Sequence, residues 1–446
     1  MTNGRTGGGH QQDFRRVVVA AAVGNVIEWY DFYIFGSLGA LLAAKFFAGS
    51  NPVVDFLKTM VIFSAGFLIR PVGALLFGWL GDRAGRKVTF MVTLMGMGLG
   101  TAVIGLVPTY ASIGLSAAFI LLALRLIQGL CLGGEYGGAI TYVAEHTPDD
   151  RRGLYTGILN TSPTIGIIVS LIVVIGVESL MGKEAFTAWG WRIPFLISFF
   201  LVMIAGYIRL SLQETPVFAE IRAKGQQTKN PWKEAFLSAN IRYVIIASVM
   251  VFGEGVVWYS SQYWTYFFLQ KGAGMDLITA SWIIGAGLLL GTPTLVFFGW
   301  LSDRMGRKPV LLAGLLLAAL LYYPLFNWLA AVTTKGQTNY ALAVIIVAIL
   351  VSFVGMVYGP IGAFLAEFFP SRIRYTSVSV PYHIGNGWGG GLVPTITYAS
   401  FVAHGSLGQA LIYPIVVPAV CFVILLFIMP ETHKISIWDA ERRAAV

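Results

Sequence analysis

Charged residues are scarce in this sequence. Asp, Glu, Lys and Arg make up 11% of its 446 residues, whereas hydrophobic residues make up 57%, and the mean hydropathy is +0.75. A water-soluble protein of this size could not bury so much apolar surface, but a lipid bilayer takes the place of water around outward-facing side chains. The composition therefore excludes a soluble protein and predicts one that is embedded in a membrane.

Cysteine and the motifs of catalysis are nearly absent. The two cysteines, Cys131 and Cys421, fall inside apolar runs, so they form no disulfide framework and no metal-ligand spacing. There is no Walker loop, no HExxH and no spacing typical of a catalytic triad. We therefore expect no enzyme, no cofactor and no drive by ATP. The glycine-rich run 96–100 lies inside an apolar run and follows no strand, so it predicts close helix packing.

Alternation of the kind that β-barrel strands show is also missing, and the apolar runs are too long for such strands. We therefore expect an all-α membrane protein. Twelve runs are long enough for a membrane-spanning helix, which needs about 20 residues. They cover residues 17–44, 57–80, 88–107, 112–136, 155–180, 189–211, 241–270, 277–301, 309–331, 340–367, 375–403 and 408–430.

Positive charge is distributed unevenly between the predicted loops. With twelve crossings and an inside N-terminus, 22 of the 30 Lys and Arg fall in inside segments. Because cationic loops resist translocation, both termini are predicted to be cytoplasmic. The net charge of +9 therefore reflects topology and indicates no nucleic-acid partner. The first apolar run is too long for a signal-peptide core, which fits a multi-pass protein of the bacterial inner (plasma) membrane.

One half of the chain repeats the other. Residues 77–87 read FGWLGDRAGRK and residues 298–308 read FGWLSDRMGRK, with nine of eleven identical. A second pair, Glu145 with Arg152 and Glu367 with Arg374, recurs at nearly the same offset. Two six-helix bundles related by a parallel repeat are therefore expected, with boundaries at 1–211 for the first bundle, 212–240 for a polar cytoplasmic linker, and 241–446 for the second bundle with its short tail.

Each copy of the repeated loop follows an apolar run and concentrates Asp, Arg and Lys in a short turn. The functional interpretation is a cytoplasmic gate that pairs the two halves when the inner side is shut; the alternative is a turn that only marks topology. The duplication favours the gate. Its predicted residues are Gly78, Asp82, Arg83, Arg86, Lys87, Asp303, Arg304 and Arg307.

This loop resembles the motif of the major facilitator superfamily. Three further segments resemble its metabolite:proton symporter family: residues 24–32 (GNVIEWYDF), residues 125–138, and Glu367 to Tyr375. The resemblance covers nearly the whole chain, and the shikimate/α-ketoglutarate-like branch is the nearest. The osmosensing branch carries a long C-terminal coiled coil, and the segment after Pro430 has no heptad pattern, which counts against that branch. The family's known members carry organic acids or zwitterionic osmolytes.

Ionisable residues inside the predicted spans are costly and usually face a cavity or a partner. Glu28 and Asp31 are three residues apart and share a helix face. Two poorly solvated carboxylates this close should repel, so one of them is expected to exchange protons at physiological pH. The alternative is that one or both pair permanently with a cation on another helix.

Arg125 lies near the middle of its span, with Gln128 one turn on. A guanidinium binds a carboxylate through two hydrogen bonds and cannot be deprotonated. Arg125 is therefore expected to hold an anionic substrate, or to neutralise Glu28 or Asp31 between substrates; a permanent structural ion pair is the alternative. Glu135, nearer the cytoplasmic end, fits a structural role better.

Three more intramembrane residues carry weaker hypotheses. Glu254 precedes a polar, aromatic stretch and is expected to take part in substrate binding or proton coupling. Arg70 fits a snorkelling or bracing role better than a substrate role. His383 could titrate near neutrality, although a lone histidine in a helix bundle is more often simply hydrogen-bonded.

The sequence therefore predicts a proton-coupled symporter that takes up a small organic acid by alternating access. The alternatives are a symporter of a zwitterionic osmolyte of the proline/betaine type, a proton-coupled exporter on the same fold, and a sensor. We expect a monomer whose partners are the substrate, protons and the lipid bilayer. Proton coupling is assigned to Glu28, Asp31 and Glu254, and substrate binding to Arg125, Gln128, Tyr30, Tyr33, Trp258, Tyr259, Gln262 and Asn386.

Overall fold

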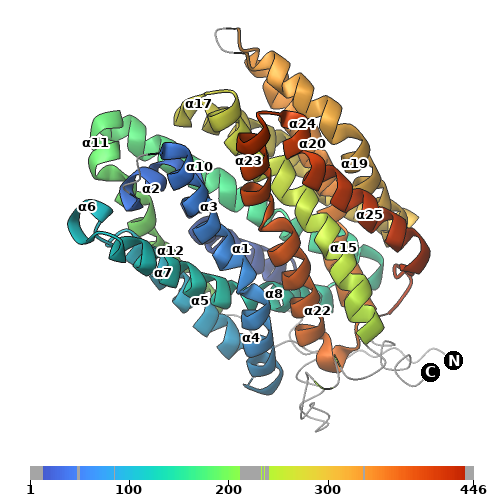
Figure 1. The fold of residues 1–446 in the computed structure, drawn as a ribbon. Coiled ribbons are helices and arrows are strands. Elements are labelled where there is room, and N and C mark those ends of the chain that lie inside the picture. The colour runs from blue at the N-terminus through green and yellow to red at the C-terminus, as the bar shows by residue number, and fades with distance from the viewer. Residues whose placement is uncertain are drawn as a thin grey trace, which may run out of the picture.

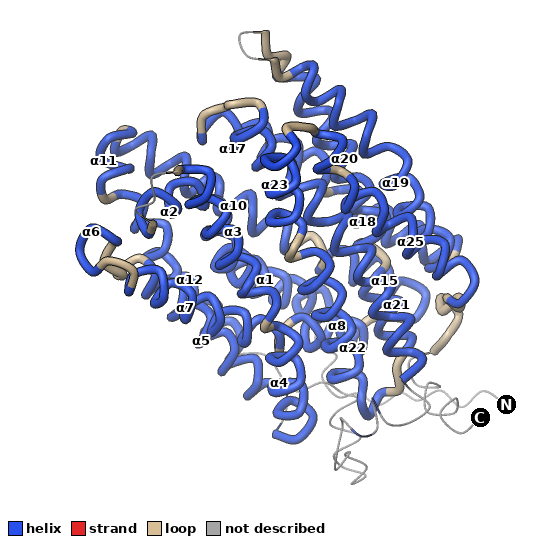
Figure 2. The backbone as a smooth tube through the Cα atoms, viewed as in Figure 1, coloured by secondary structure: helices blue, strands red, loops and turns tan. Residues whose placement is uncertain are grey.

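The computed structural model describes residues 14–47, 51–84, 86–210, 233, 236, 241–334 and 337–436. Within these ranges the regular backbone is helical and contains no strand, which confirms the predicted fold class. Figures 1 and 2 show long helices packed side by side. We call the described residues 14–210 the first half and 241–436 the second half.

The first half begins with a bent pair of helices, and several of its later spans are also built from consecutive shorter helices. Its helices are α1 (Phe14–Ser37), α2 (Gly39–Phe46), α3 (Pro52–Leu68), α4 (Arg70–Ala84), α5 (Arg86–Ile104), α6 (Tyr110–Ile113), α7 (Ser116–Gly133), α8 (Tyr136–His146), α9 (Arg152–Leu159), α10 (Ser162–Met181), α11 (Lys183–Ala188) and α12 (Ile193–Leu210).

The second half repeats this arrangement but contains three π-helical segments, η3 (Ser260–Trp264), η4 (Phe268–Gly272) and η6 (Ile384–Gly390). Its α-helices are α15 (Ile241–Tyr259), α16 (Thr265–Phe267), α17 (Leu277–Gly291), α18 (Pro293–Met305), α19 (Arg307–Val332), α20 (Tyr340–Tyr358), α21 (Ile361–Phe368), α22 (Arg374–His383), α23 (Val393–His404), α24 (Leu407–Ala410) and α25 (Ile412–Ile428).

Each of the twelve predicted spans coincides with helical backbone. Among the described residues, nine helices are long and apolar enough to cross a membrane, or ten if the pair Ala22–Ser37 and Gly39–Phe46, bent by 60°, is one span. The two remaining predicted spans are the shorter apolar helix Met91–Ile104 and the segment 375–403, which η6 interrupts. The predicted count of twelve spans therefore exceeds the nine long apolar helices because bends and breaks divide or shorten the others.

Several helices begin where a polar side chain satisfies their first free backbone N–H groups. Asn51 accepts from the N–H of Val53 at the start of α3, and Asp276 accepts from the N–H of Thr279 at the start of α17. The turn between α18 and α19 depends on Gly306, whose φ of 102° is strained for any residue with a Cβ. The repeated loop thus needs glycine for its geometry.

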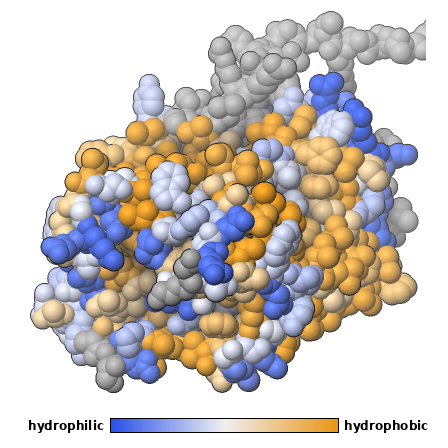
Figure 3. Space-filling model, turned by 90° about the horizontal axis from the view of Figure 1, so that it is seen from above, coloured by the Kyte–Doolittle hydropathy of each residue, from blue (hydrophilic) through white to orange (hydrophobic). Residues whose placement is uncertain are grey.

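Large apolar side chains cover the outward faces of the bundle. Phe119, Phe200, Leu320 and Phe427 are all more than 60% exposed, and Figure 3 shows broad hydrophobic areas on the flank seen at the right. Water would disfavour such a surface, whereas lipid tails accommodate it. The charged residues at the centre of the bundle, among them Arg70, Arg125 and Glu254, are instead buried between the helices.

Glycines bring the first-half helices into backbone contact. A Cβ on Gly129 of α7 would lie 2.0 Å from the carbonyl oxygen of Gly66, and one on Gly133 would lie 2.2 Å from that of Arg70. Helix α7 therefore packs directly on the backbones of α3 and α4. The predicted close packing around residues 96–100 is also found, because a Cβ on Gly98 would lie 2.5 Å from Val202.

The two halves touch at both ends of the bundle. At one end, which we call the latch end, α4 and α8 pack against α22, and α9 packs against α18 and α21. At the opposite end α3 packs against α23 and α10 against α17, and the ring of Phe56 meets those of Phe267 and Tyr398 at 5.5 and 4.8 Å. The centre of the molecule is therefore closed from both sides.

Candidate functional site

Two arginines occupy the centre of the first half. Arg125 on α7 is fully buried; its Nη1 donates to the carbonyl oxygen of Phe32 at 3.3 Å and to Oε1 of Gln128 at 2.9 Å. Its Nε and Nη2 have no hydrogen-bond partner. No carboxylate of the described residues forms an ion pair with it, so a permanent structural ion pair, the alternative to the predicted cavity role, is not present in this conformation.

Arg70, the first residue of α4, is equally buried, and all three of its guanidinium nitrogens lack a hydrogen-bond partner. Its guanidinium carbon lies 4.0 Å from the ring centre of Phe67 and 4.3 Å from that of Phe32. Phe32 also contacts Arg125, whose guanidinium carbon is 4.0 Å from the same ring centre. The structure thus places both arginines on one phenylalanine, and we call them the arginine pair.

Aromatic side chains from both halves surround this pair. The ring of Tyr33 on α1 stacks on Trp29 at 5.0 Å and on Trp258 of α15 at 5.4 Å. Its hydroxyl lies 3.2 Å from the hydroxyl of Tyr259, and the hydroxyl of Tyr263 donates to its carbonyl oxygen. Three predicted wall residues, Tyr33, Trp258 and Tyr259, therefore meet where the halves join.

The second half contributes a polar group beside these rings. Nδ2 of Asn386, in η6, donates to Glu254 on α15 at 3.0 Å, and both side chains are buried. Both ring nitrogens of the buried His383 lack a hydrogen-bond partner, and the charge of Arg70 acts on this histidine. The expected proximity of Glu254 and Asn386 to the centre is thus present in the structure.

Asp31 is buried, and neither of its carboxylate oxygens has a hydrogen-bond partner. It interacts electrostatically with Glu135 and lies near Ser198 of α12, within the first half. A hydrogen-bond chain connects its backbone to Arg125: Gln128 donates to Thr101, whose hydroxyl is shared between the carbonyl oxygens of Met97 at 3.0 Å and Asp31 at 3.3 Å. Glu28 is likewise buried.

Three further residues that were predicted to bind substrate are Tyr30, Gln128 and Gln262. The hydroxyl of Tyr30 donates to the carbonyl oxygen of Pro194 at 2.6 Å, so it points into the first half. Gln128 holds Arg125 and Thr101. Gln262, in η3, lines a small cavity between the halves. Its amide group has no hydrogen-bond partner.

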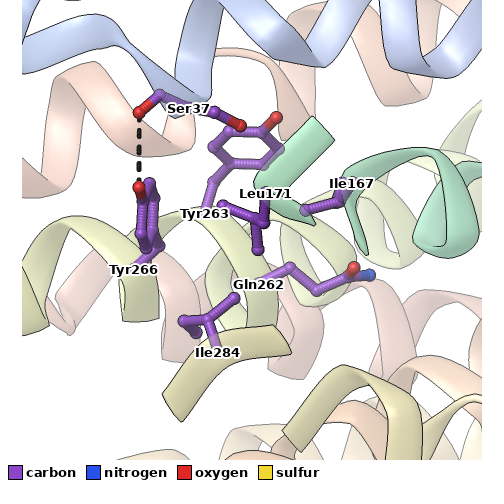
Figure 4. Close-up of a pocket in the computed structure, with 7 residues that line it drawn as sticks. All are labelled: Ser37, Ile167, Leu171, Gln262, Tyr263, Tyr266 and Ile284. Carbon is purple, nitrogen blue, oxygen red and sulfur yellow. Dashed lines mark hydrogen bonds between the residues drawn. The ribbon is translucent and has the colours of Figure 1, made fainter. Parts of the chain in front are cut away.

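Figure 4 shows this cavity, with Gln262 and Ile284 on one side and Ser37, Ile167 and Leu171 opposite. The hydroxyl of Tyr266 donates to the carbonyl oxygen of Ser37, which bridges the two halves. The cavity lies on the seam between the halves, toward the end opposite the latch.

At the latch end, two ion pairs join the halves reciprocally. Arg152 of the first half binds Glu367 of the second at 2.9 Å, and Arg374 of the second binds Glu145 of the first at the same distance. These four residues are the repeated pair of the sequence. Each glutamate therefore binds the arginine of the opposite half, and all four side chains are almost fully buried.

The second copy of the repeated loop joins this network. The carboxylate of Asp303 accepts from the backbone N–H groups of Gly153 and Leu154, at the start of α9 in the other half. Arg307 donates to Asp303 and to Glu367. Arg304, which was also predicted in the gate, instead lies over the ring of Trp300 at 4.1 Å.

The first copy of the loop is described only in part. Gly78 lies against α22, where a Cβ would meet Thr376 at 3.1 Å. The side chains of Asp82, Arg83, Arg86 and Lys87 lie outside the described part of the chain. Their predicted gate contacts therefore remain predictions.

A group of residues between the centre and the latch was not predicted from the sequence. The rings of Tyr136 and Tyr382, one from each half, stack with their centres 3.4 Å apart, and Tyr358 hydrogen-bonds Tyr382. Asn160 donates to the carbonyl oxygen of Tyr358 across the halves at 2.6 Å. The sequence signal for this region is the repeated pair Glu145 and Glu367.

Comparison with known proteins supports a transport role. The model of the family described as sugar (and other) transporter matches residues 17–229 and 217–443. The inner membrane metabolite transport protein YhjE of Escherichia coli is 31% identical, over 95% of this chain and 98% of its own length. The glycine betaine/proline/ectoine/pipecolic acid transporter OusA of Dickeya dadantii is 32% identical, over 94% and 84%.

A solved structure shows the same fold. The proton:xylose symporter XylE of the major facilitator superfamily, bound to 6-bromo-6-deoxy-D-glucose, superimposes with a TM-score of 0.78 at 16% sequence identity, covering 96% of this chain and 98% of XylE. At this identity the likeness concerns the fold and not the ligand.

Proposed function

Since the chain belongs to the sugar (and other) transporter family of the major facilitator superfamily, and is therefore a multi-pass membrane transporter and not an enzyme, we propose that it is a proton-coupled symporter of a small organic acid. The observation that carries this proposal is Arg125, a buried cation with two unpartnered guanidinium nitrogens and no carboxylate partner. An uncompensated buried charge is costly, so a bound carboxylate would complete the site.

Proton coupling in this proposal uses the buried carboxylates around the centre. Asp31 has no hydrogen-bond partner on its carboxylate, and its backbone carbonyl is connected through Thr101 and Gln128 to Arg125, while Glu254 has only Asn386. Protonation of either group removes a negative charge and leaves the arginine charge to be neutralised by the substrate. Proton and carboxylate thus enter together, because each lowers the cost of burying the other. Glu28 is a third candidate.

Alternating access follows from the latch. The reciprocal pairs Arg152–Glu367 and Glu145–Arg374 hold the latch end shut, and their rupture would let the halves rock apart. We further propose that this end faces the cytoplasm, that the bundles span 1–211 and 241–446 with a linker at 212–240, and that the protein acts as a monomer. Gly78, Asp82, Arg83, Arg86 and Lys87 are proposed to complete the gate.

A zwitterionic osmolyte is the second candidate substrate. Tyr33 is stacked between Trp29 and Trp258, and rings of this kind attract a cationic group. The relative OusA is named for betaine and proline transport. In this case the carboxylate would bind Arg125 and the cationic group would bind the aromatic rings.

The test is the proton-coupled current of the purified protein in liposomes under an inward proton gradient. Shikimate, 2-oxoglutarate, citrate, proline and betaine form the panel. A current with an acid and none with proline or betaine supports the first candidate, and the reverse supports the second. Acidification of the outer solution on adding substrate, instead of alkalinisation, would show proton-coupled export.

The Arg125→Gln variant makes the test specific. Loss of a charge-assisted contact to a carboxylate should raise the KM for the transported compound by about tenfold or more. Arg242→Gln is the matched control, because Arg242 is exposed at the start of α15 and contacts only the neighbouring Tyr243 among the described residues. Wild-type KM values in the Arg125→Gln variant would contradict the assignment of Arg125.

A further inference from the structure

Arg70 is a second buried cation without a counter-ion among the described residues. It is 0% exposed and forms no ion pair, and although it interacts with the side chain of Tyr259, none of its three guanidinium nitrogens is close enough to a partner for a regular hydrogen bond. Stacking on Phe32 and Phe67 compensates only part of the cost of removing a guanidinium from water. An arginine braced for purely structural reasons would be expected to donate to backbone carbonyls, as Arg192 does to those of Gly105 and Val107.

The arginine pair is spread along α1. Arg70 contacts the rings of Trp29 and Phe32, at 5.5 and 4.3 Å, whereas Arg125 contacts those of Phe32 and Phe35, at 4.0 and 4.6 Å. The two guanidinium groups thus share Phe32 but extend from it toward opposite ends of the helix. They therefore sit at different depths, about one helical turn or ~5 Å apart along α1.

Both arginines lie at the seam where the second half could close on a ligand. The charges of both act on Tyr259, on α15 of the second half, and that of Arg70 also acts on His383 of α22. A Cβ on Gly387 of η6 would lie 3.9 Å from Cβ of Arg70. These contacts place the arginine pair between first-half rings on one side and the second half on the other.

We propose that Arg70 is a second anion contact and that the arginine pair selects substrates with two carboxylates over substrates with one. A single carboxylate satisfies the fork of one guanidinium and would leave the other charge uncompensated in an apolar setting. Two carboxylates joined by a short carbon chain neutralise both groups at their different depths. This inference rests on the proposed function, and it specifies the class of organic acid.

Arg70 would then determine specificity, while Arg125 binds the carboxylate that all substrates share. Removing Arg70 should cost a dicarboxylate one charge-assisted contact but should cost a monocarboxylate little. If Arg70 had a purely structural role, its removal would impair the transport of dicarboxylates and monocarboxylates together. The ratio of the two affinities therefore separates the proposed role from a structural one.

The experiment measures uptake into liposomes of succinate, glutarate and 2-oxoglutarate, with butyrate, pentanoate and betaine as singly carboxylated probes. We expect the wild type to transport at least one dicarboxylate, with a lower KM than for the monocarboxylate of the same carbon number. In Arg70→Gln the KM for that dicarboxylate should rise by about tenfold or more, while the KM for monocarboxylates should hardly change. Arg70→Lys keeps the charge but loses the two-pronged geometry of the guanidinium. Its KM for the dicarboxylate should lie between those of the wild type and of Arg70→Gln.

Arg242→Gln serves again as the matched control, and the elution profile in detergent shows whether each variant is folded. A wild-type KM for the dicarboxylate in Arg70→Gln would overturn the inference. So would a wild type that carries butyrate, pentanoate or betaine but no dicarboxylate, although carboxylate transport itself would then stand. Should Arg70→Gln not fold, equal loss of both substrate classes in Arg70→Lys would overturn it. A wild type that moves none of the panel would contradict the proposed function as well.

Discussion

At the scale of single residues, the centre of the protein combines buried charges that the described side chains do not neutralise. Arg125 is held by Gln128 and by the carbonyl oxygen of Phe32, and Glu254 is held by Asn386. All of these partners are neutral, so each ionisable group is only partly satisfied. A chain that must move both a proton and a substrate through its centre requires such groups, because complete internal pairing would leave nothing to bind.

The Glu254→Gln variant should separate substrate movement from proton movement. Glutamine keeps the hydrogen bond with Asn386 but cannot release a proton. We expect substrate exchange across liposomes without a proton gradient to stay close to the wild-type rate, while gradient-driven accumulation is lost. Radiolabelled substrate uptake with and without the gradient measures both quantities. Accumulation at the wild-type level would show that Glu254 does not carry the proton and would leave Asp31 or Glu28 for that role.

At the scale of helices, backbone contact between α7 and its neighbours positions the arginine pair. Gly133 packs on the carbonyl oxygen of Arg70, and Gly129 packs on that of Gly66, near Arg125. Side chains at these two positions would push the helices apart. The spacing between α4 and α7, and with it the spacing of the two guanidinium groups, therefore depends on these glycines.

The Gly133→Ala variant should be less stable than the wild type. Its Cβ would meet backbone atoms at 2.2 Å, which cannot rotate away, and overpacking of this kind costs about 1–3 kcal/mol. Gly176→Ala in α10 is the matched control, because nothing lies within 4 Å of its added Cβ; it should be neutral or stabilising by up to about 1 kcal/mol. Thermal unfolding of the detergent-solubilised protein measures both. Equal melting temperatures for the two variants would contradict the proposed packing.

The segment after α25 caps α19. Oxygens of the Glu431 carboxylate accept from the backbone N–H groups of Arg307, Lys308, Thr432 and His433. Burial alone would raise the pKa of Glu431, but these four hydrogen bonds outweigh it and hold the pKa below the ordinary value of 4.5. Because the folded-state pKa is depressed, the stabilisation is complete above pH 4.5 and is lost as the pH falls through the folded-state value.

The pH dependence of thermal stability tests this cap. The melting temperature of the wild type should fall more steeply between pH 5 and pH 3 than that of Glu431→Gln, which has no charge to lose. Asp276, whose pKa is also lowered, titrates in both proteins, so the difference between the curves isolates Glu431. Parallel curves would show that the cap does not depend on the carboxylate charge.

At the scale of the whole molecule, the internal repeat produces two ion pairs, each of which joins one half of the molecule to the other. Glu145 and Glu367 occupy repeated positions, and each binds the repeated arginine of the opposite half. Glu367 also binds Arg307 and accepts from Thr432. Glu367 therefore joins two arginines at the latch, one from each half.

The Glu367→Gln and Glu145→Gln variants should each shift the molecule toward a form that is open at the latch end. Removing one partner of a buried ion pair costs about 3–5 kcal/mol, and Glu367→Gln leaves two arginines without it. Pulsed electron paramagnetic resonance between spin labels at Arg151→Cys and Arg304→Cys, both exposed, reports the opening. Distance distributions unchanged by either variant would contradict the latch.

Charge reversal controls for loss of folding. Glu145→Arg combined with Arg374→Glu keeps the pair with exchanged partners, so it should recover the closed distance that either single change loses. Glu184→Gln in α11, exposed and at the end opposite the latch, should leave the distribution unchanged.

The sequence by itself determined the fold class, the repeat and the buried charged residues. Hydropathy and helical periodicity are local properties, so runs of about 20 apolar residues identify spans without knowledge of their neighbours. The same holds for Arg125 and Glu254, whose depth follows from their place in a run. The bend between α1 and α2 was not evident, because it depends on packing across helices.

Only the tertiary structure decided which of these residues meet. Tyr30 and Tyr33 are three residues apart, yet the first donates to Pro194 inside the first half and the second faces Tyr259 of the other half. Likewise, Arg70 gave no strong signal until the structure placed it on the same ring as Arg125. The rotation of each helix about its axis and the choice of its neighbours come from long-range packing, which no local pattern encodes.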